Sequence, residues 1–159
     1  MMLHNSFGVD LGSSTLKIYD QRKDKITKEK NMIALRDKDE VLAIGNDAYE
    51  MFEKTPKNIK IMEPVNNGRI GDVFLTEAIL HTLLNRSGSS VGYRPVLYFA
   101  VPTGLTKIEK RAYYAVAHRG KLRKCKIFLV DRPIVDAIAL GIPLNRTKGS
   151  MIMNIGSQC

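Results

Sequence analysis

Residues 7–19 read Phe-Gly-Val-Asp-Leu-Gly-Ser-Ser-Thr-Leu-Lys-Ile-Tyr, which predicts two short apolar strands joined by a turn rich in glycine and serine. In such a turn, Gly12 would let the backbone approach a phosphate, to which the N–H groups and serine hydroxyls would donate. Lys17 could add a point charge, and Asp10 could hold a hydrated Mg²⁺ through water. The same residues also fit an ordinary β-turn capped by an aspartate, so this motif alone leaves both interpretations open.

A second turn of the same design occurs near the end of the sequence. Residues 151–157 repeat the order of apolar strand, Asx, apolar residue, glycine and serine. We predict a last strand over 149–155. We expect residues 154–157 and residues 10–13 to lie at neighbouring strand ends that face one cleft.

The rest of the chain alternates between predicted strands and helices. The second half predicts a strand over 96–101 that is buried on both faces, a strand over 126–130, and helices over 72–84, 106–119 and 133–140. The first half predicts antiparallel strands over 32–35 and 41–44 and a short helix over 46–52. These elements predict a layered α/β fold with a mixed sheet of about five strands.

Composition excludes several classes of protein. The 159 residues are 44% hydrophobic and 26% charged, which excludes wholesale disorder, and no apolar run approaches the roughly 20 residues of a membrane-spanning helix. Cys125 and Cys159 lie outside any CxxC motif or Cys/His cluster, so neither a disulfide framework nor a structural zinc site is expected. The first ten residues lack a signal-peptide pattern, and we therefore expect a protein of the reducing cytosol.

The net charge of +9 is concentrated in one stretch. Residues 107–126 hold eight lysines and arginines against one acid, Glu109. This basic stretch predicts either a solvated face or a surface for polyanions such as nucleic acid and anionic lipid. No recognition helix or aromatic stacking platform accompanies the charge, so a basic nucleic-acid-binding domain is the weaker alternative.

Further segments resemble the MreB family, the bacterial actin-like proteins that determine rod shape. Two glycine-containing turns that clamp one phosphate chain are typical of actin, hexokinase and the heat-shock chaperone ATPases. Six more segments are similar to MreB in residue pattern and spacing: Val-Leu-Ala-Ile-Gly-Asn-Asp-Ala at 41–48, Lys-Thr-Pro-Lys-Asn-Ile at 54–59, Pro-Val-Asn-Asn-Gly-Arg-Ile-Gly-Asp at 64–72, Ala-Val-Pro-Thr-Gly at 100–104, Val-Asp-Arg-Pro at 130–133, and the run 141–151. The resemblance covers nearly the whole chain.

The resemblance implies an actin-like (ribonuclease H-like) α/β fold, a mixed sheet with flanking helices. Residues 1–30 and 71–159 would form subdomain IA, and residues 31–70 would form the inserted subdomain IB. By this resemblance, the sequence would hold only the first half of the family fold. The face of IA that packs against that second half would be apolar and exposed.

The resemblance also implies an ATP site with Mg²⁺, in which Asp10 would contact the metal through water. The nucleotide-binding residues would be Asp10, Gly12, Ser13, Ser14, Thr15, Lys17, Gly156, Ser157 and Gln158. Since the adenine and ribose contacts in this family come largely from the second half, we expect a half-site that binds nucleotide weakly.

Arg132 and several residues of the second turn, among them Cys159 in place of a threonine, depart from the family pattern. MreB uses the second acid of a Glu-Glu-Pro run to orient the attacking water, and Arg132 stands at that position. A guanidinium cannot accept a proton from water. In the second turn, Asn154 replaces an aspartate, and Ser157 and Gln158 replace glycines. We therefore assign no catalytic residue and expect impaired hydrolysis.

The resemblance implies partners and a location as well. A truncated or degenerate MreB-like protein would bind MreB-type filament subunits, either its own copies or full-length homologues. The expected location is the cytoplasm. Peripheral contact with the inner face of the cell membrane would have to use the basic stretch, because the loop over 86–94 offers only Val91 and Tyr93 for insertion. The alternative is a non-catalytic module that caps filaments, because head-to-tail stacking needs two faces and this chain would carry one. No specific nucleic acid is expected as a partner.

Overall fold

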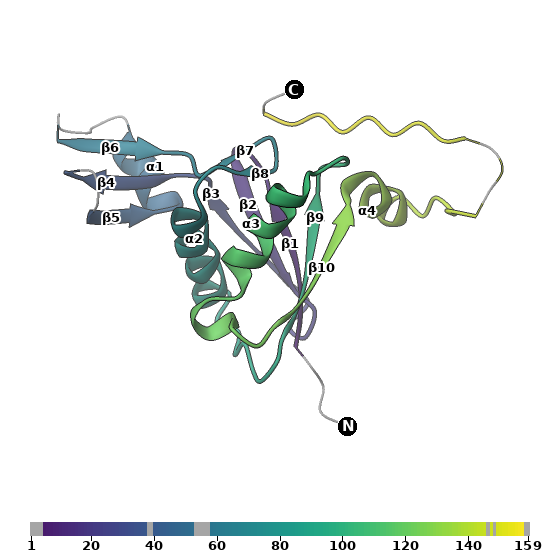
Figure 1. The fold of residues 1–159 in the computed structure, drawn as a ribbon, viewed down its shortest axis with the longest axis horizontal. Coiled ribbons are helices and arrows are strands. Elements are labelled where there is room, and N and C mark those ends of the chain that lie inside the picture. Colours follow the sequence, from purple (N-terminus) through teal and green to yellow (C-terminus); the bar gives the residue numbers. More distant parts are fainter. Residues whose placement is uncertain (1–4, 38–39, 53–57, 146, 148, 158–159) are drawn as a thin grey trace.

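The hairpin formed by residues 7–19 lies at the centre of the largest sheet. The computed structural model describes residues 5–37, 40–52, 58–145, 147 and 149–157. The strands of this sheet are β1 (Ser6–Leu11), β2 (Thr15–Asp20), β3 (Lys25–Lys30), β9 (Val96–Val101) and β10 (Lys126–Asp131). They lie in the order β10-β9-β1-β2-β3, with β1 antiparallel to β2 and parallel to β9 (Figure 1). The prediction of a mixed five-stranded sheet is confirmed.

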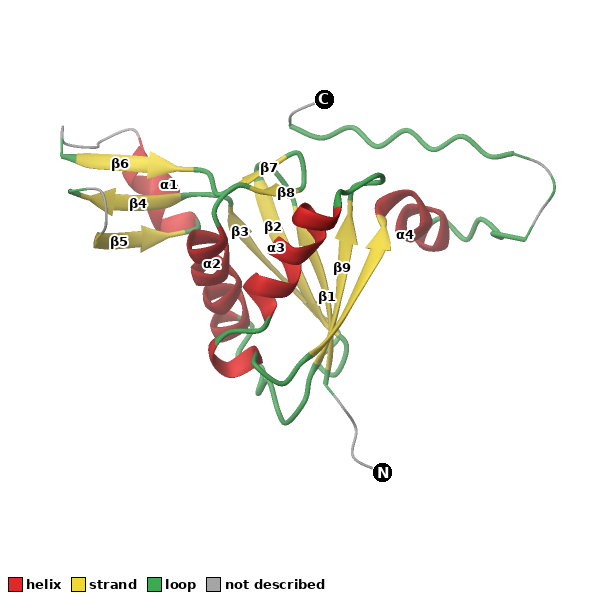
Figure 2. Cartoon of the chain, in the orientation of Figure 1, coloured by secondary structure: helices red, strands yellow, loops and turns green. Residues whose placement is uncertain are grey.

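Helices α2 (Val73–Arg86) and α3 (Lys107–Ala117) cover one face of the five-stranded sheet (Figure 2). Asp72 caps α2 by accepting a hydrogen bond from the N–H of Leu75, and Thr106 begins α3 with a capping box. A third helix, α4 (Arg132–Ala139), follows β10, so all three predicted helices of the second half are confirmed. Among the described residues, no helix has the length and hydropathy needed to cross a bilayer.

The opposite face of the sheet is apolar and partly open. Burial alternates along β9, so that Leu97 and Phe99 are buried whereas Tyr98 is 44% exposed and stacks on Phe128 of β10. The prediction that this strand is buried on both faces is therefore wrong, because α2 and α3 pack on the other side. Phe128, Tyr98, Gly8, Tyr19 and Ile26 are consecutive partners across the five strands and form one cross-strand row. Its aromatic and aliphatic side chains are 38–57% exposed, so this part of the sheet face is apolar and open.

A second, smaller sheet lies beside the first (Figure 1). Its strands are β4 (Ile33–Arg36), β5 (Glu40–Ile44) and β6 (Ile59–Met62), with β4 antiparallel to both others, and α1 (Asn46–Phe52) packs against β4 and β5. The predicted strand pair and short helix are confirmed, whereas β6 was not predicted. A short hairpin of β7 (Val65–Asn66) and β8 (Arg69–Ile70) then leads the chain to α2.

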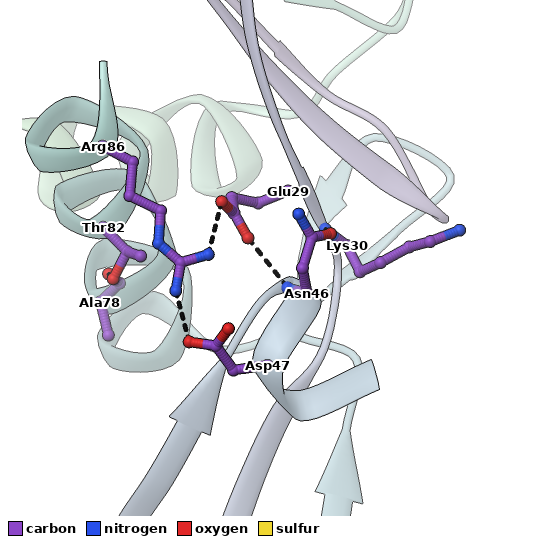
Figure 3. Close-up of polar contacts among 7 residues, drawn as sticks. All are labelled: Glu29, Lys30, Asn46, Asp47, Ala78, Thr82 and Arg86. Atoms are coloured by element: carbon purple, nitrogen blue, oxygen red, sulfur yellow. Dashed lines mark hydrogen bonds and ion pairs between the residues drawn. The ribbon is translucent and has the colours of Figure 1, made fainter. Parts of the chain in front are cut away.

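A buried carboxylate joins the two sheets and α2. Glu29 of β3 is 2% exposed; its Oε1 lies 2.7 Å from Nη1 of Arg86, and its Oε2 accepts from the N–H of Asn46 at 2.9 Å (Figure 3). Arg86 also pairs with Asp47 of α1. Gly45 has a φ of +68°, and an added Cβ there would lie 2.1 Å from Oε2 of Glu29. The contacts of Glu29 with Arg86 and Asn46 therefore fix where α1 and the small sheet meet the large sheet.

The strand predicted over 149–155 is not formed. The segment carries no strand pairing, and its side chains Met151, Met153 and Ile155 are 87%, 72% and 80% exposed. A strand needs a neighbour that satisfies its N–H and C=O groups, and none of the described strands pairs with this segment. Residues 154–157 therefore do not lie at a strand end, and that part of the prediction is wrong.

Replacing Gly45 by alanine should destabilise the protein more than the same change at Gly92. Both glycines have a positive φ (68° and 67°), and alanine in this backbone conformation lowers the free energy of unfolding by about 1–2 kcal/mol. Only at Gly45 would the new Cβ also displace the Glu29 carboxylate from its partners, for a further loss of about 1–3 kcal/mol. Urea unfolding followed by circular dichroism measures both free energies. Equal losses in the two variants would contradict the role given to this contact.

Candidate functional site

Strands β1, β9 and β10 are parallel and end at the same edge of the large sheet, where a cavity of about 490 Å³ opens. Ligands of α/β sheets commonly bind outside this carboxyl edge. Near the end of β1, Asp10 lies in register with Ala100 of β9 and with Lys17 of β2. The residues that line the cavity are Asp10, Gly12, Ser13, Ser14, Thr15, Lys17, Asn67, Gly68, Ala100, Pro102, Arg132, Val135, Asp136, Asn154, Ile155, Gly156 and Ser157.

The turn between β1 and β2 is closely packed and firmly anchored. At Gly12 an added Cβ would lie 2.6 Å from the carbonyl oxygen of Thr15, so only glycine fits without moving the turn. The amide of fully buried Asn31 donates to the carbonyl oxygens of Ser13 and Val65, each at 2.6 Å. Asn31 could not be predicted from the sequence, because no motif marks it and its partners lie 18 and 34 positions away.

Asp10 lies between two cations. Its Oδ1 is 2.6 Å from Nη2 of Arg132, and its Oδ2 is 3.1 Å from Nζ of Lys17. Arg132 is the first residue of α4, directly after β10, and this position brings its guanidinium to the end of β1. The sequence identified Arg132 as a departure from the family pattern but gave no sign of its contact with Asp10.

The hairpin of β7 and β8 supplies a further part of the cavity lining. The N–H of Asn67 donates to Oγ of Ser13 at 2.9 Å, and the hydroxyl of Tyr113 donates to the carbonyl oxygen of Gly68. Burial raises the pKa of Tyr113 to about 12, so this hydroxyl keeps its proton and remains a donor well above neutral pH. The Asn-Gly pair at 67–68 is a hairpin signal in the sequence that could have located this turn.

The second turn reaches the same cavity without a strand behind it. Asn154, Gly156 and Ser157 line the cavity together with the first turn, and the amide of Asn154 donates to Oδ2 of Asp136 at 2.9 Å. Gln158, the remaining residue predicted for this site, lies outside the described residues. The structure thus gathers every other predicted site residue at one cavity.

The basic stretch lies elsewhere. None of the residues 107–126 lines this cavity. Instead, Lys121, Arg123 and Lys124 border a separate hollow with Tyr93 and Arg94, in segments that precede β9 and β10. This hollow therefore lies at the amino edge of the parallel strands, opposite the cavity that holds the two turns.

Comparison with known proteins identifies relatives over almost the whole chain. The family model described as MreB/Mbl protein matches residues 4–159. The cell shape-determining protein MreB of Escherichia coli (strain K12) is 32% identical over 162 residues, which cover 98% of this chain and 46% of that protein. The cell shape-determining protein Mbl of Bacillus subtilis (strain 168) is 29% identical with the same coverage. The chain spans about half the length of the curated relatives it matches.

Solved structures give the same fold. MreB5 of Spiroplasma citri bound to AMPPNP matches with a TM-score of 0.77 at 21% identity, over 89% of this chain and 43% of that one. MamK in its double helical filament matches with a TM-score of 0.72 at 16% identity, over 87% of this chain and 44% of that one. These likenesses establish the actin-like fold, and the match of the family model over residues 4–159 shows that the chain belongs to the MreB/Mbl family.

Proposed function

We propose that this chain is the nucleotide-binding part of an MreB-like cytoskeletal protein of cell-shape determination. The large sheet with its helices would be subdomain IA (residues 1–30 and 71–159), and the small sheet would be subdomain IB (residues 31–70). ATP or ADP would bind by its phosphates at the edge of the large sheet. The observation that carries the proposal is that both turns and two cationic side chains, Lys17 and Arg132, line one cavity. A related protein, MreB5 of Spiroplasma citri, has been solved bound to ADP and to AMPPNP.

The cavity offers the groups that bind a phosphate chain. Residues 12–15 present a turn with backbone N–H groups and three hydroxyls. The Oγ of Ser13 accepts from Asn67, which leaves its own O–H available to donate. Lys17 is about half exposed and can turn its ammonium toward a bound phosphate. Because adenine and ribose contacts would come from outside this chain, binding by phosphates alone should be weak.

We further propose that hydrolysis is impaired. By the family resemblance, Arg132 stands where the water-orienting acid would be. Its guanidinium donates to Asp10 and has no acceptor atom for a water molecule. Asn154, at a position where the resemblance gives an aspartate, binds Asp136 through its amide. Neither side chain can take up a proton from an attacking water.

The proposed partners are MreB-type filament subunits, either further copies of this chain or full-length homologues. MamK, a structural neighbour, has been solved as a double helical filament. The exposed cross-strand row that contains Tyr98 and Phe128 supports an association surface, since apolar patches of this kind mark contact sites. The proposed location is the cytoplasm, with any peripheral membrane contact made through the basic stretch.

Nucleotide binding should depend on Gly12 and Lys17. Gly12→Val would drive a side chain into the carbonyl of Thr15, and Lys17→Ala would remove a charge from the cavity, so each should weaken ADP binding by about tenfold or more. The measurement is the shift of amide NMR signals over residues 10–17 during ADP titration. Gly149→Val, where nothing lies within 4 Å, and Lys126→Ala, which lies outside the cavity, serve as matched controls.

The opposite pattern would contradict the site. The contradicting result has three parts: ADP shifts the amide signals of Lys121, Arg123 and Lys124, its affinity falls steeply with salt, and Gly12→Val leaves binding unchanged. The protein would then be responding to the negative charge of ADP at the basic stretch. The nucleic-acid-binding alternative would then be favoured.

The purified protein should release no phosphate from ATP above background, with or without Mg²⁺. The physical reason is that the cavity places an arginine and an amide where a proton acceptor is needed. Phosphate release is measured with a colorimetric or coupled assay, and the Asp10→Ala variant distinguishes intrinsic activity from a contaminant. Hydrolysis by the unmodified protein that disappears in Asp10→Ala would overturn this proposal.

A further inference from the structure

Both acids that line the cavity are already bound to side chains. Asp10 uses one oxygen for Arg132 and the other for Lys17, and Asp136 accepts from the amide of Asn154. Across the described residues, no group of three or more acids, histidines and cysteines is arranged to hold a metal ion. Mg²⁺ prefers carboxylate, water and phosphate oxygens in octahedral geometry. The side chains present do not fit the Mg²⁺ that the family resemblance implies.

The charges around Asp10 also oppose a divalent cation. Mg²⁺ held beside Asp10 would share that carboxylate with Lys17 and Arg132, and like charges at such separations repel. Direct coordination of the metal by Asp10 would compete with these charge-assisted hydrogen bonds, which are among the stronger ones in proteins. Asp10 is only about one-third exposed, so solvent screens this repulsion incompletely.

Arg132 is held where it can contact a phosphate. It follows β10 directly, and its guanidinium lies between Asp10 and the turn at Gly68, where an added Cβ would be 3.9 Å from Nη2. The contact with Asp10 uses Nη2, and the five N–H donors of a guanidinium leave others for the oxygens of a phosphate. Arginine pairs with phosphate in a bidentate manner that suits this position.

We propose that this chain binds nucleotide phosphates without a divalent cation, with the Arg132 guanidinium supplying the positive charge that a metal would otherwise bring. This inference rests on the proposed function, and its ligand is a nucleoside diphosphate or triphosphate without a bound metal ion. Asp10 then acts as a positioning residue that holds Arg132 and Lys17 toward the cavity. It is not a metal ligand.

The first test compares the Kd of the unmodified protein for ADP in Mg²⁺ and in EDTA, by isothermal titration calorimetry at equal ionic strength. We expect ADP to bind at least as tightly in EDTA as in Mg²⁺, since no metal ligand is lost when Mg²⁺ is removed and dissolved Mg²⁺ competes with Arg132 for the phosphates. Binding that is more than about threefold weaker in EDTA than in Mg²⁺ would overturn the inference and leave the proposed function intact. Absence of ADP binding in both buffers would overturn the proposed function together with the inference.

The second test changes Arg132 itself. Arg132→Gln should weaken ADP binding in EDTA by about tenfold or more, because it removes a charged donor from the phosphates, and Arg132→Lys should retain part of the affinity. The matched control is Arg36→Gln, which removes the same charge from an arginine outside the cavity and should leave the Kd unchanged. Circular dichroism checks that each variant is folded. An Arg132→Gln protein that binds ADP in EDTA as well as the unmodified one would overturn the role of Arg132.

Discussion

The candidate site depends on the central position of β1. This strand pairs antiparallel with β2 and parallel with β9, so each residue near its carboxyl end has a fixed neighbour on both sides. Asp10 therefore faces Lys17 across one strand pair, and the end of β10, two strands away, brings Arg132 within 2.6 Å. Because Val9 and Leu11 are buried in the core, a one-residue shift of β1 would turn Asp10 inward and dismantle the site.

Local signals in the sequence predicted most of the helices and strands. Contacts between residues that are far apart in the sequence could not be predicted. The aspartate at 72 and the capping box at 106–109 marked two helices correctly, because caps act within one turn of the helix. Apolar residues at 149–155 predicted a strand that did not form, since a strand also requires a partner that no local pattern supplies. Asn31 and its contact with Val65, 34 positions away, gave no signal of any kind.

The site shows the same division between local and distant information. Gly12 and Lys17 were predicted from a single turn, and the structure brings them to the cavity with the second turn. The pairing of Arg132 with Asp10, 122 positions apart, could not be predicted, although it changes the chemistry of the site most. From the sequence, Arg132 could be described only as unable to activate water. Its contact with Asp10 places its guanidinium where we propose that it supplies positive charge to the phosphates.

The most direct measurement is a crystal structure of the protein with ADP, grown in the presence of Mg²⁺. The account predicts phosphates within hydrogen-bonding distance of residues 12–15 and of the Arg132 guanidinium, with no metal between Asp10 and the phosphates. A Mg²⁺ ion that bridges Asp10 and the phosphates, with Arg132 turned away, would contradict the proposed charge substitution. ADP bound instead in the hollow bordered by Lys121 and Arg123 would contradict the site itself.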